Sequence, residues 1–210
     1  MESTSLKSNQ LQDAWRNFKG GDFASLGIFF ETHYQELYYY GIKLVAMPEL
    51  VKDTIQDLFA DVWERRSKMT SVENFKAYLI ISLRRELIRR INKARKESAA
   101  ELPASFQFPF LQEDFIINNE ENQEHSRLLA QSLEGLTERQ REVILLRFFH
   151  GLEFQEISKV LEMNLQSVRN LLFRALEKIR KDMQDQGVNG VENVEMFLWF
   201  AFGKKKTIRN

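Results

Sequence analysis

The stretch 136–181 limits what this chain can fold into more than any other part, because three helical patterns follow one another there. Thr137 and Gln140 have the spacing of a capping box, which predicts where the first of these helices begins. A second helix is expected over 154–161, and Asn164 is a suitable N-cap for the third. A short helix, a tight turn and a longer helix in this order predict a helix-turn-helix.

The third of these helices is amphipathic. Its apolar stripe consists of Val168, Leu171, Leu172, Ala175, Leu176 and Ile179. Its opposite face presents Gln166, Ser167, Asn170, Phe173 and Arg174, with Arg169 at the edge. Amide side chains match adenine edges and arginine matches guanine or phosphate, so this face favours binding in the major groove of DNA. A plain three-helix bundle with a hydrated polar face is the alternative.

The 30 basic and 30 acidic residues of the chain cancel, but they are unevenly distributed. The stretch 84–96 has seven basic residues and one acidic residue, whereas 97–124 has seven acidic residues and no lysine or arginine. The stretch 137–181 is basic again, with nine basic against six acidic residues. We therefore expect two positive patches separated by an acidic connector, and a polyanion responds to such local fields rather than to the total charge.

Composition and motif content argue against an enzyme, a disulfide-bonded protein and a membrane-spanning protein. The chain has no cysteine, which excludes disulfides and thiolate chemistry and suits a reducing cytosol. His33, His125 and His150 are isolated, and neither a phosphate-binding glycine loop nor metal-ligand spacing occurs, so we expect no catalysis, no cofactor and no metal. No export signal is apparent and no apolar run approaches the ~20 residues of a membrane span, which predicts a cytoplasmic protein.

Three long helical patterns occupy the first half of the chain. The first covers 22–45, and Pro48 then stands at a first helical position of the second, which runs to about Arg66. The third covers about 72–96. No alternation with period two is long enough for a sheet, so the predicted fold class is all-α.

The second of these helices has an acidic face. An acidic face beside an aromatic ring suits a basic helical partner, because charge aids orientation and the ring supplies contact area. A simply hydrated face is the alternative. The apolar side carries Ile55, Leu58, Phe59 and Val62, and the other side carries Asp53, Asp57, Ala60 and Glu64, with Gln56 and Trp63 at the boundary.

The third helix is basic on one side. Its apolar side carries Ile80, Leu83, Leu87 and Ile91, and its other side carries Tyr78, Ser82, Arg85, Arg89 and Asn92, followed by Lys93, Arg95 and Lys96. Aromatic rings stack on bases and cations follow the backbone, so this face suits single-stranded DNA. Cations at a helix end also interact with the macrodipole, but seven within thirteen residues exceed what that interaction needs.

Several strings resemble those of sigma factors of the extracytoplasmic-function (ECF) class, within the sigma-70 family. LTERQREV at 136–143, together with SVRN at 167–170 and RAL at 174–176, resembles sigma region 4, as does the Glu-Ile pair at 156–157. DTIQDLFADVW at 53–63 is similar to the sigma region 2 helix that docks on the polymerase clamp.

This resemblance implies two small helical domains joined by a flexible acidic linker. Region 2 would occupy 1–97, the linker 98–127 and region 4 128–185, followed by an apolar and basic tail at 186–210. The implied function is a sigma factor that binds core RNA polymerase and directs promoter-specific initiation. The implied partners are the polymerase clamp and flap, double- and single-stranded promoter DNA, and an anti-sigma factor, with the chain at the nucleoid while polymerase is bound.

The resemblance also implies roles for individual residues. The upstream (−35) element would be read by Gln166, Ser167, Arg169, Asn170, Phe173 and Arg174. The proximal (−10) element would be melted and read by Tyr78, Ser82, Arg85, Arg89, Asn92 and Lys93. Polymerase would be bound by Asp53, Gln56, Asp57, Phe59 and Trp63. Two positions depart from the family pattern: Glu162 replaces the usual glycine of the turn, and Arg85 stands where asparagine is common.

Three alternatives stay open. The linker is either a plain tether or, as in the family, a strand that threads toward the polymerase active centre. The apolar segment 194–202 is expected to pack on a neighbouring module; the alternative is a partner-binding or autoinhibitory segment, for which deletion of 194–210 would raise DNA binding by the free chain. A stand-alone helix-turn-helix regulator is the competing function, and it would bind an operator tightly without polymerase.

Overall fold

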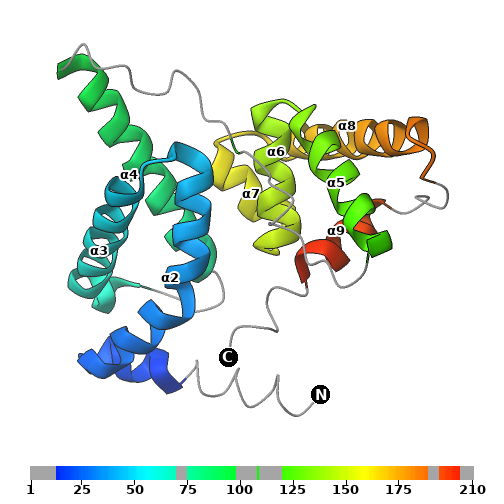
Figure 1. The fold of residues 1–210 in the computed structure, drawn as a ribbon. Coiled ribbons are helices and arrows are strands. Elements are labelled where there is room, and N and C mark those ends of the chain that lie inside the picture. Colours follow the sequence, from blue (N-terminus) through cyan, green and yellow to red (C-terminus); the bar gives the residue numbers. More distant parts are fainter. Residues whose placement is uncertain (1–12, 70–74, 98–107, 109–119, 189–193, 204–210) are drawn as a thin grey trace. The chain divides into compact units, whose positions relative to one another are not determined.

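The computed structural model describes residues 13–69, 75–97, 108, 120–188 and 194–203 (Figure 1). The chain divides into two compact units, 1–106 and 107–210, and each is considered by itself. Within the described residues every regular element is a helix, so the predicted all-α class is confirmed. None of the described helices is both long and apolar enough to cross a bilayer.

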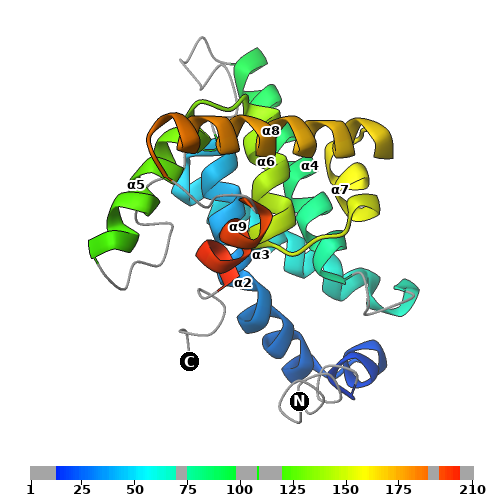
Figure 2. The same ribbon diagram turned by 90° about the vertical axis from the view of Figure 1, so that its right-hand side faces the viewer.

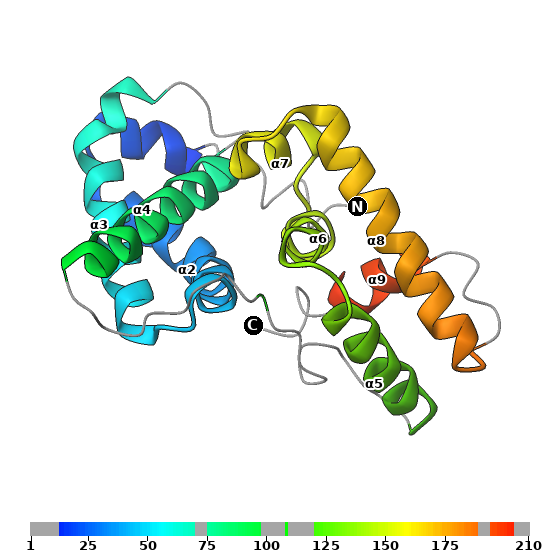
Figure 3. The same ribbon diagram turned by 90° about the horizontal axis from the view of Figure 1, so that it is seen from above.

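The three long helices of the first unit pack side by side, α2 (Phe23–Val45), α3 (Pro48–Arg65) and α4 (Phe75–Glu97) (Figure 3). Asp22 caps α2 by accepting hydrogen bonds from two backbone amides of its first turn. Pro48 begins α3, as predicted, and η1 (Arg66–Lys68) ends it. Gly41 lets α2 and α3 approach closely, because a Cβ there would lie 2.6 Å from a methyl group of Val51.

Aromatic rings cluster at the end of this unit where α2 and α4 begin. Residues 13–20 form a helix that the sequence analysis did not predict, and it buries Trp15 and Phe18. The Trp15 ring lies 5.3 Å from Phe75, and the Phe75 ring lies 5.2 Å from Phe29, both edge-on. Ring pairs of this geometry add to the free energy gained by burying the rings. The segment before α2 is therefore part of the core of the first unit.

His33 lies against this cluster, with its ring 5.7 Å from that of Phe75. Burial lowers the pKa of His33 to about 4; nearby Glu36 opposes this and Lys76 reinforces it. The folded pKa lies below that of an exposed imidazole, so the contribution to stability is full above pH ~6.5 and is lost as the pH falls toward 4.

Acidification is therefore expected to weaken the first unit. Between pH 7 and pH 5 we expect the free energy of unfolding to fall by about 2 kcal/mol through this one group. Urea unfolding at the two pH values measures the loss, and His33→Gln should remove most of it. An equal loss in the wild type and the variant would contradict the assignment.

The second unit contains α5 (Glu120–Glu134), α6 (Glu138–Ile144), η3 (Leu145–Phe149), α7 (Phe154–Leu161), α8 (Leu165–Asp185) and α9 (Val194–Gly203) (Figure 2). The predicted capping box is present: the Thr137 amide donates to Gln140 Oε1 at 3.0 Å, and the Gln140 amide donates to Thr137 Oγ1. Asn164 Oδ1 caps α8 by accepting from the Ser167 amide at 2.7 Å. The three helices of the predicted helix-turn-helix are therefore confirmed.

Two predictions about this unit need correction. Glu120 begins α5, so residues 120–127 belong to a helix and not to an extended linker. Their three glutamates, one glutamine and one arginine favour a helix but supply no apolar period. The first helix of the motif also does not stay α-helical, because η3 is a π-helix in which the His150 amide donates to the Leu145 carbonyl. The wider turn buries Phe148 and leaves Phe149 half-buried.

The turn between α7 and α8 passes through Glu162 in the left-handed conformation, with φ 55° and ψ 43°. Its amide and that of Met163 both donate to the Ser158 carbonyl, so the α7 C-terminus is satisfied. A residue with a Cβ is strained in this conformation, whereas glycine is not. Glu162 thus adopts a conformation that suits glycine, and the backbone is strained there.

Glu162→Gly should therefore stabilise the second unit by about 0.5–1 kcal/mol, since relief of strain exceeds the added entropy of the unfolded chain. Chemical denaturation measures this change. Glu162→Ala is the matched control, because it removes the same side-chain contacts and keeps the strain. A glycine variant no more stable than the alanine variant would show that the backbone is not strained.

Candidate nucleic-acid interface

The outward face of α8 carries the residues predicted to read the upstream element. Gln166, Arg169, Asn170, Phe173 and Arg174 are exposed and Ser167 is half-buried. The Phe173 side chain is 61% exposed, which is unusual for so apolar a ring. Gln166 donates to Asn170 Oδ1 at 3.0 Å, so the two amides are held together. The opposite stripe is buried against α5, α6 and α7, and this packing turns the polar face toward solvent.

A shallow groove of about 500 Å³ lies between α3 and α4 in the first unit. It brings together four of the six residues predicted for the proximal element with the acidic side of α3. Asn92 and Lys93 lie beyond the groove on α4, where both are exposed. The lining consists of Asp57, Leu58, Ala60, Asp61 and Arg65 from α3 and Tyr78, Ser82, Arg85, Glu86, Arg89 and Arg90 from α4.

A chain of ion pairs crosses this groove. Arg90 donates to Asp57 on α3 at 2.5 Å and to Glu86 at 2.7 Å. Glu86 also accepts two hydrogen bonds from Arg89, at 2.6 and 2.8 Å. Hydrogen bonding from Arg89, and then from Arg90, lowers the pKa of Glu86 to about 2, although burial opposes the shift. Glu86 therefore stays ionised at neutral pH and partly neutralises the positive charge of Arg89.

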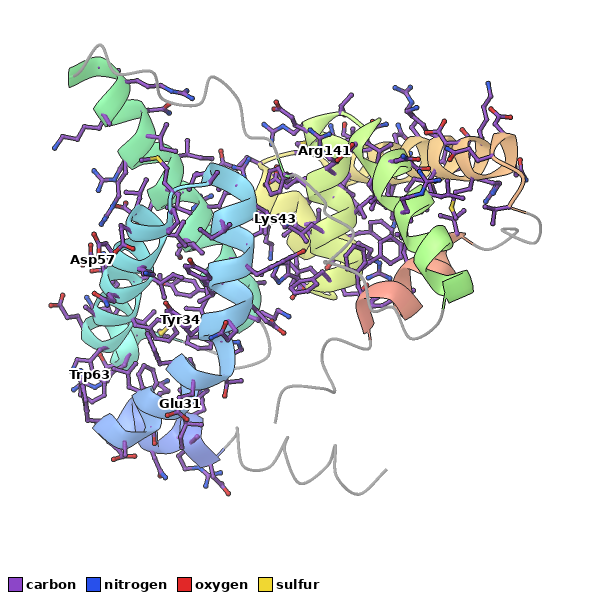
Figure 4. The ribbon with its side chains drawn as sticks, in the orientation of Figure 1. Glu31, Tyr34, Lys43, Asp57, Trp63 and Arg141 are labelled. Carbon is purple, nitrogen blue, oxygen red and sulfur yellow. The ribbon has the colours of Figure 1, made fainter. Side chains whose placement is uncertain are left out.

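The predicted polymerase-binding residues separate into surface and core. Asp53, Gln56 and Asp57 are exposed on α3, and Trp63 is half-buried near the end of that helix (Figure 4). Phe59 is only 4% exposed and packs edge-on against Phe30. Its ring supports the helix from inside, so we leave it out of the candidate contact surface.

The structure adds two residues to this surface that the sequence did not indicate. Phe23 is 68% exposed and its ring lies 5.2 Å from Trp63 in an edge-on arrangement. The guanidinium of Arg66 lies 4.2 Å from the centre of the Trp63 ring. A cation over the face of an indole is a favourable contact that orients the ring. Phe23 begins α2 and Arg66 lies in η1, so neither belongs to the periodic pattern of α3.

Among the described residues, no group of three or more histidine, aspartate or glutamate side chains could hold a metal ion. Two family models match the chain: Sigma-70 region 2 matches residues 29–97, and Sigma-70, region 4 matches residues 126–179. The matched segments together cover more than half of the chain, and each lies within one of the two units.

Two curated relatives are similar to this chain over most of their length. The ECF RNA polymerase sigma factor SigK of Mycobacterium ulcerans is 22% identical over 175 residues, which cover 83% of this chain and 94% of that protein. SigK of Mycobacterium tuberculosis H37Rv is 22% identical over 174 residues, covering 82% and 93%.

Two solved structures have the same fold at low sequence identity. CnrH, in complex with the cytosolic domain of CnrY, aligns with a TM-score of 0.52 at 18% identity and covers 82% of this chain and 96% of its own. RpoE of Bartonella quintana, in complex with the anti-sigma factor NepR, aligns with a TM-score of 0.51 at 18% identity, covering 75% and 96%. The chain belongs to the ECF class of the sigma-70 family and directs promoter-specific initiation of transcription by RNA polymerase.

Proposed function

We propose that this sigma factor reads promoters with two separate surfaces and docks on polymerase with a third. The outward face of α8 binds the upstream element in the major groove. The basic side of α4 binds the melted proximal strand, and the acidic face of α3 with Trp63 binds the polymerase clamp. The observation that best supports this division is the polar face of α8, whose amides and arginines are exposed while the apolar stripe behind them is buried.

The ion pairs of the α3–α4 groove refine the role of the first unit. Asp57 is held by Arg90, and Arg89 is held by Glu86. Each pair has one exposed partner, and ion pairs open to solvent contribute little to stability, so polymerase and DNA can each replace them at little cost. Arg89 would then exchange Glu86 for a backbone phosphate when the strand opens.

We propose an anti-sigma factor as a regulatory partner, because one similar structure is a complex with a protein so described. The chain itself acts by binding, with no reaction at its own side chains, and we place it in the cytoplasm, where it joins the nucleoid as part of the polymerase. The linker would pass toward the polymerase active centre.

In-vitro transcription on a library of randomised promoters, with core polymerase and the full chain, tests this function. We expect transcripts only when both are present, and enrichment of one upstream and one proximal sequence. A stand-alone regulator would instead enrich a single operator by binding without polymerase and would yield no transcripts. That second outcome would overturn the proposal.

A further inference from the structure

The C-terminal helix α9 is part of the core of the second unit. Val194, Leu198 and Phe202 recur every four residues and are 1%, 0% and 1% exposed. The Phe202 ring lies 6.1 Å from Phe149 of η3, and α9 also contacts α8 (Figure 2). Helix α9 therefore packs on the neighbouring helices, as expected for the apolar segment 194–202.

Trp199 lies off this buried stripe. Its side chain is 40% exposed, yet its ring lies edge-on to Phe148 at 5.4 Å. The guanidinium of Arg147 lies 5.7 Å from the centre of the indole ring. Leu198 and the rest of the buried stripe anchor α9 in the core, and the ring contacts of Trp199 lie outside that stripe.

Arg147 joins Trp199 to the helix-turn-helix. On its other side the guanidinium lies 5.1 Å from the ring of Phe154, the first residue of α7. Arg147 also donates to the Leu152 carbonyl at 3.0 Å and pairs with Glu153 at 3.1 Å. Glu153 is the N-cap residue of α7, so Arg147 fixes the loop from which that helix starts.

Phe154 in turn contacts the recognition helix. The guanidinium of Arg169 on α8 lies 5.8 Å from the Phe154 ring. Aromatic rings and guanidinium groups thus alternate from α9 to the outward face of α8. The order is Trp199, Arg147, Phe154 and Arg169. An exposed arginine has many rotamers, and a ring beneath it reduces the number it samples.

We propose that Trp199 is a positioning residue for upstream-element recognition, acting through Arg147 and Phe154 on Arg169. The proposal rests on the assignment of α8 as the DNA-reading helix. Trp199 contacts no DNA; it limits the directions in which the Arg169 guanidinium points. Cation–π contacts at exposed sites are weak, so we expect Trp199→Ala to weaken binding of the upstream element roughly two- to five-fold.

A double-mutant cycle separates positioning from a merely structural role. The probe is the upstream duplex that the wild-type chain selects from a random pool with core polymerase. Trp199→Ala should weaken binding in the wild-type background and leave it unchanged in the Arg169→Ala background, whereas Trp199→Phe should restore it. Unfolding of each variant is measured in parallel.

An equal loss in both backgrounds, or no loss in either, would overturn the positioning role. A wild-type chain that selects no upstream sequence would overturn the proposed function itself, so the two failures are distinguishable. Glu195→Ala, at an exposed position of the same helix, is the matched control and should bind as the wild type does.

Discussion

Leu198→Ala is expected to lower the free energy of unfolding of the second unit by about 2–5 kcal/mol, because a fully buried leucine is replaced and a cavity remains. The effect should be this large although Leu198 lies in the tail, since the side chain is inside the core that α8 and η3 share with α9. Hydrogen exchange of the α8 amides reports on this unit separately from the first.

Glu195→Ala is again the matched control, because that side chain is exposed and surface changes usually stay within about 0.5 kcal/mol. Unchanged protection of α8 in Leu198→Ala would mean that α9 is not part of the core. The burial of α9 in the core also argues against the autoinhibitory alternative for this segment. The outward face of α8 is exposed while α9 is in place, so we expect deletion of 194–210 to destabilise the unit rather than to raise DNA binding.

Arg174→Ala is expected to reduce affinity for the upstream element by about 1–3 kcal/mol, roughly 5- to 150-fold, if its guanidinium makes a bidentate contact to a base. Arg174 is exposed on the same face as Gln166 and Asn170, where a major groove would lie. The loss should be confined to promoters that carry the selected upstream sequence. It is measured with core polymerase as the ratio of binding to the selected and a scrambled element.

Two further variants show whether the effect of Arg174→Ala is specific. Arg180→Ala removes an exposed cation from the same helix and should lower binding to both elements alike. Arg89→Ala should slow strand opening and leave the upstream contact intact, because that residue lies in the first unit. Equal losses on selected and scrambled elements for Arg174→Ala would assign it to the DNA backbone instead.

Local signals in the sequence predicted most of the helices correctly. The Thr137–Gln140 capping box and the Asn164 cap satisfy backbone amides by contacts within a few residues, and such contacts are visible as spacing. Pro48 marks a helix start because it has no N–H to leave unpaired and its φ is already helical. The stripe of α8 was visible for the same reason. The apolar stripe of α8 also located the polar face of that helix, because the polar face is the part that lies outside the stripe.

Features that depend on distant residues were missed. The Asp57–Arg90 pair joins α3 to α4 across 33 positions, so no local pattern reveals it. Phe59 was placed at a partner surface by resemblance, whereas packing against Phe30 buries it. The π-helical turn of η3 has no residue signature of its own, since it is stabilised by what packs on it.

The wide turn of η3 has a consequence for how this chain tolerates gain and loss of residues. A π-helical turn holds one residue more than the α-helical turn it replaces, so deleting one residue from Leu145–Phe149 would restore an ordinary helix. The deletion would also rotate Phe148 and Phe149 by about 100° about the helix axis relative to α6. Their rings would then turn away from their partners on α9, Trp199 and Phe202. The extra residue and α9 therefore depend on each other although they are far apart in the sequence, and we expect related chains to inherit both or to lack both.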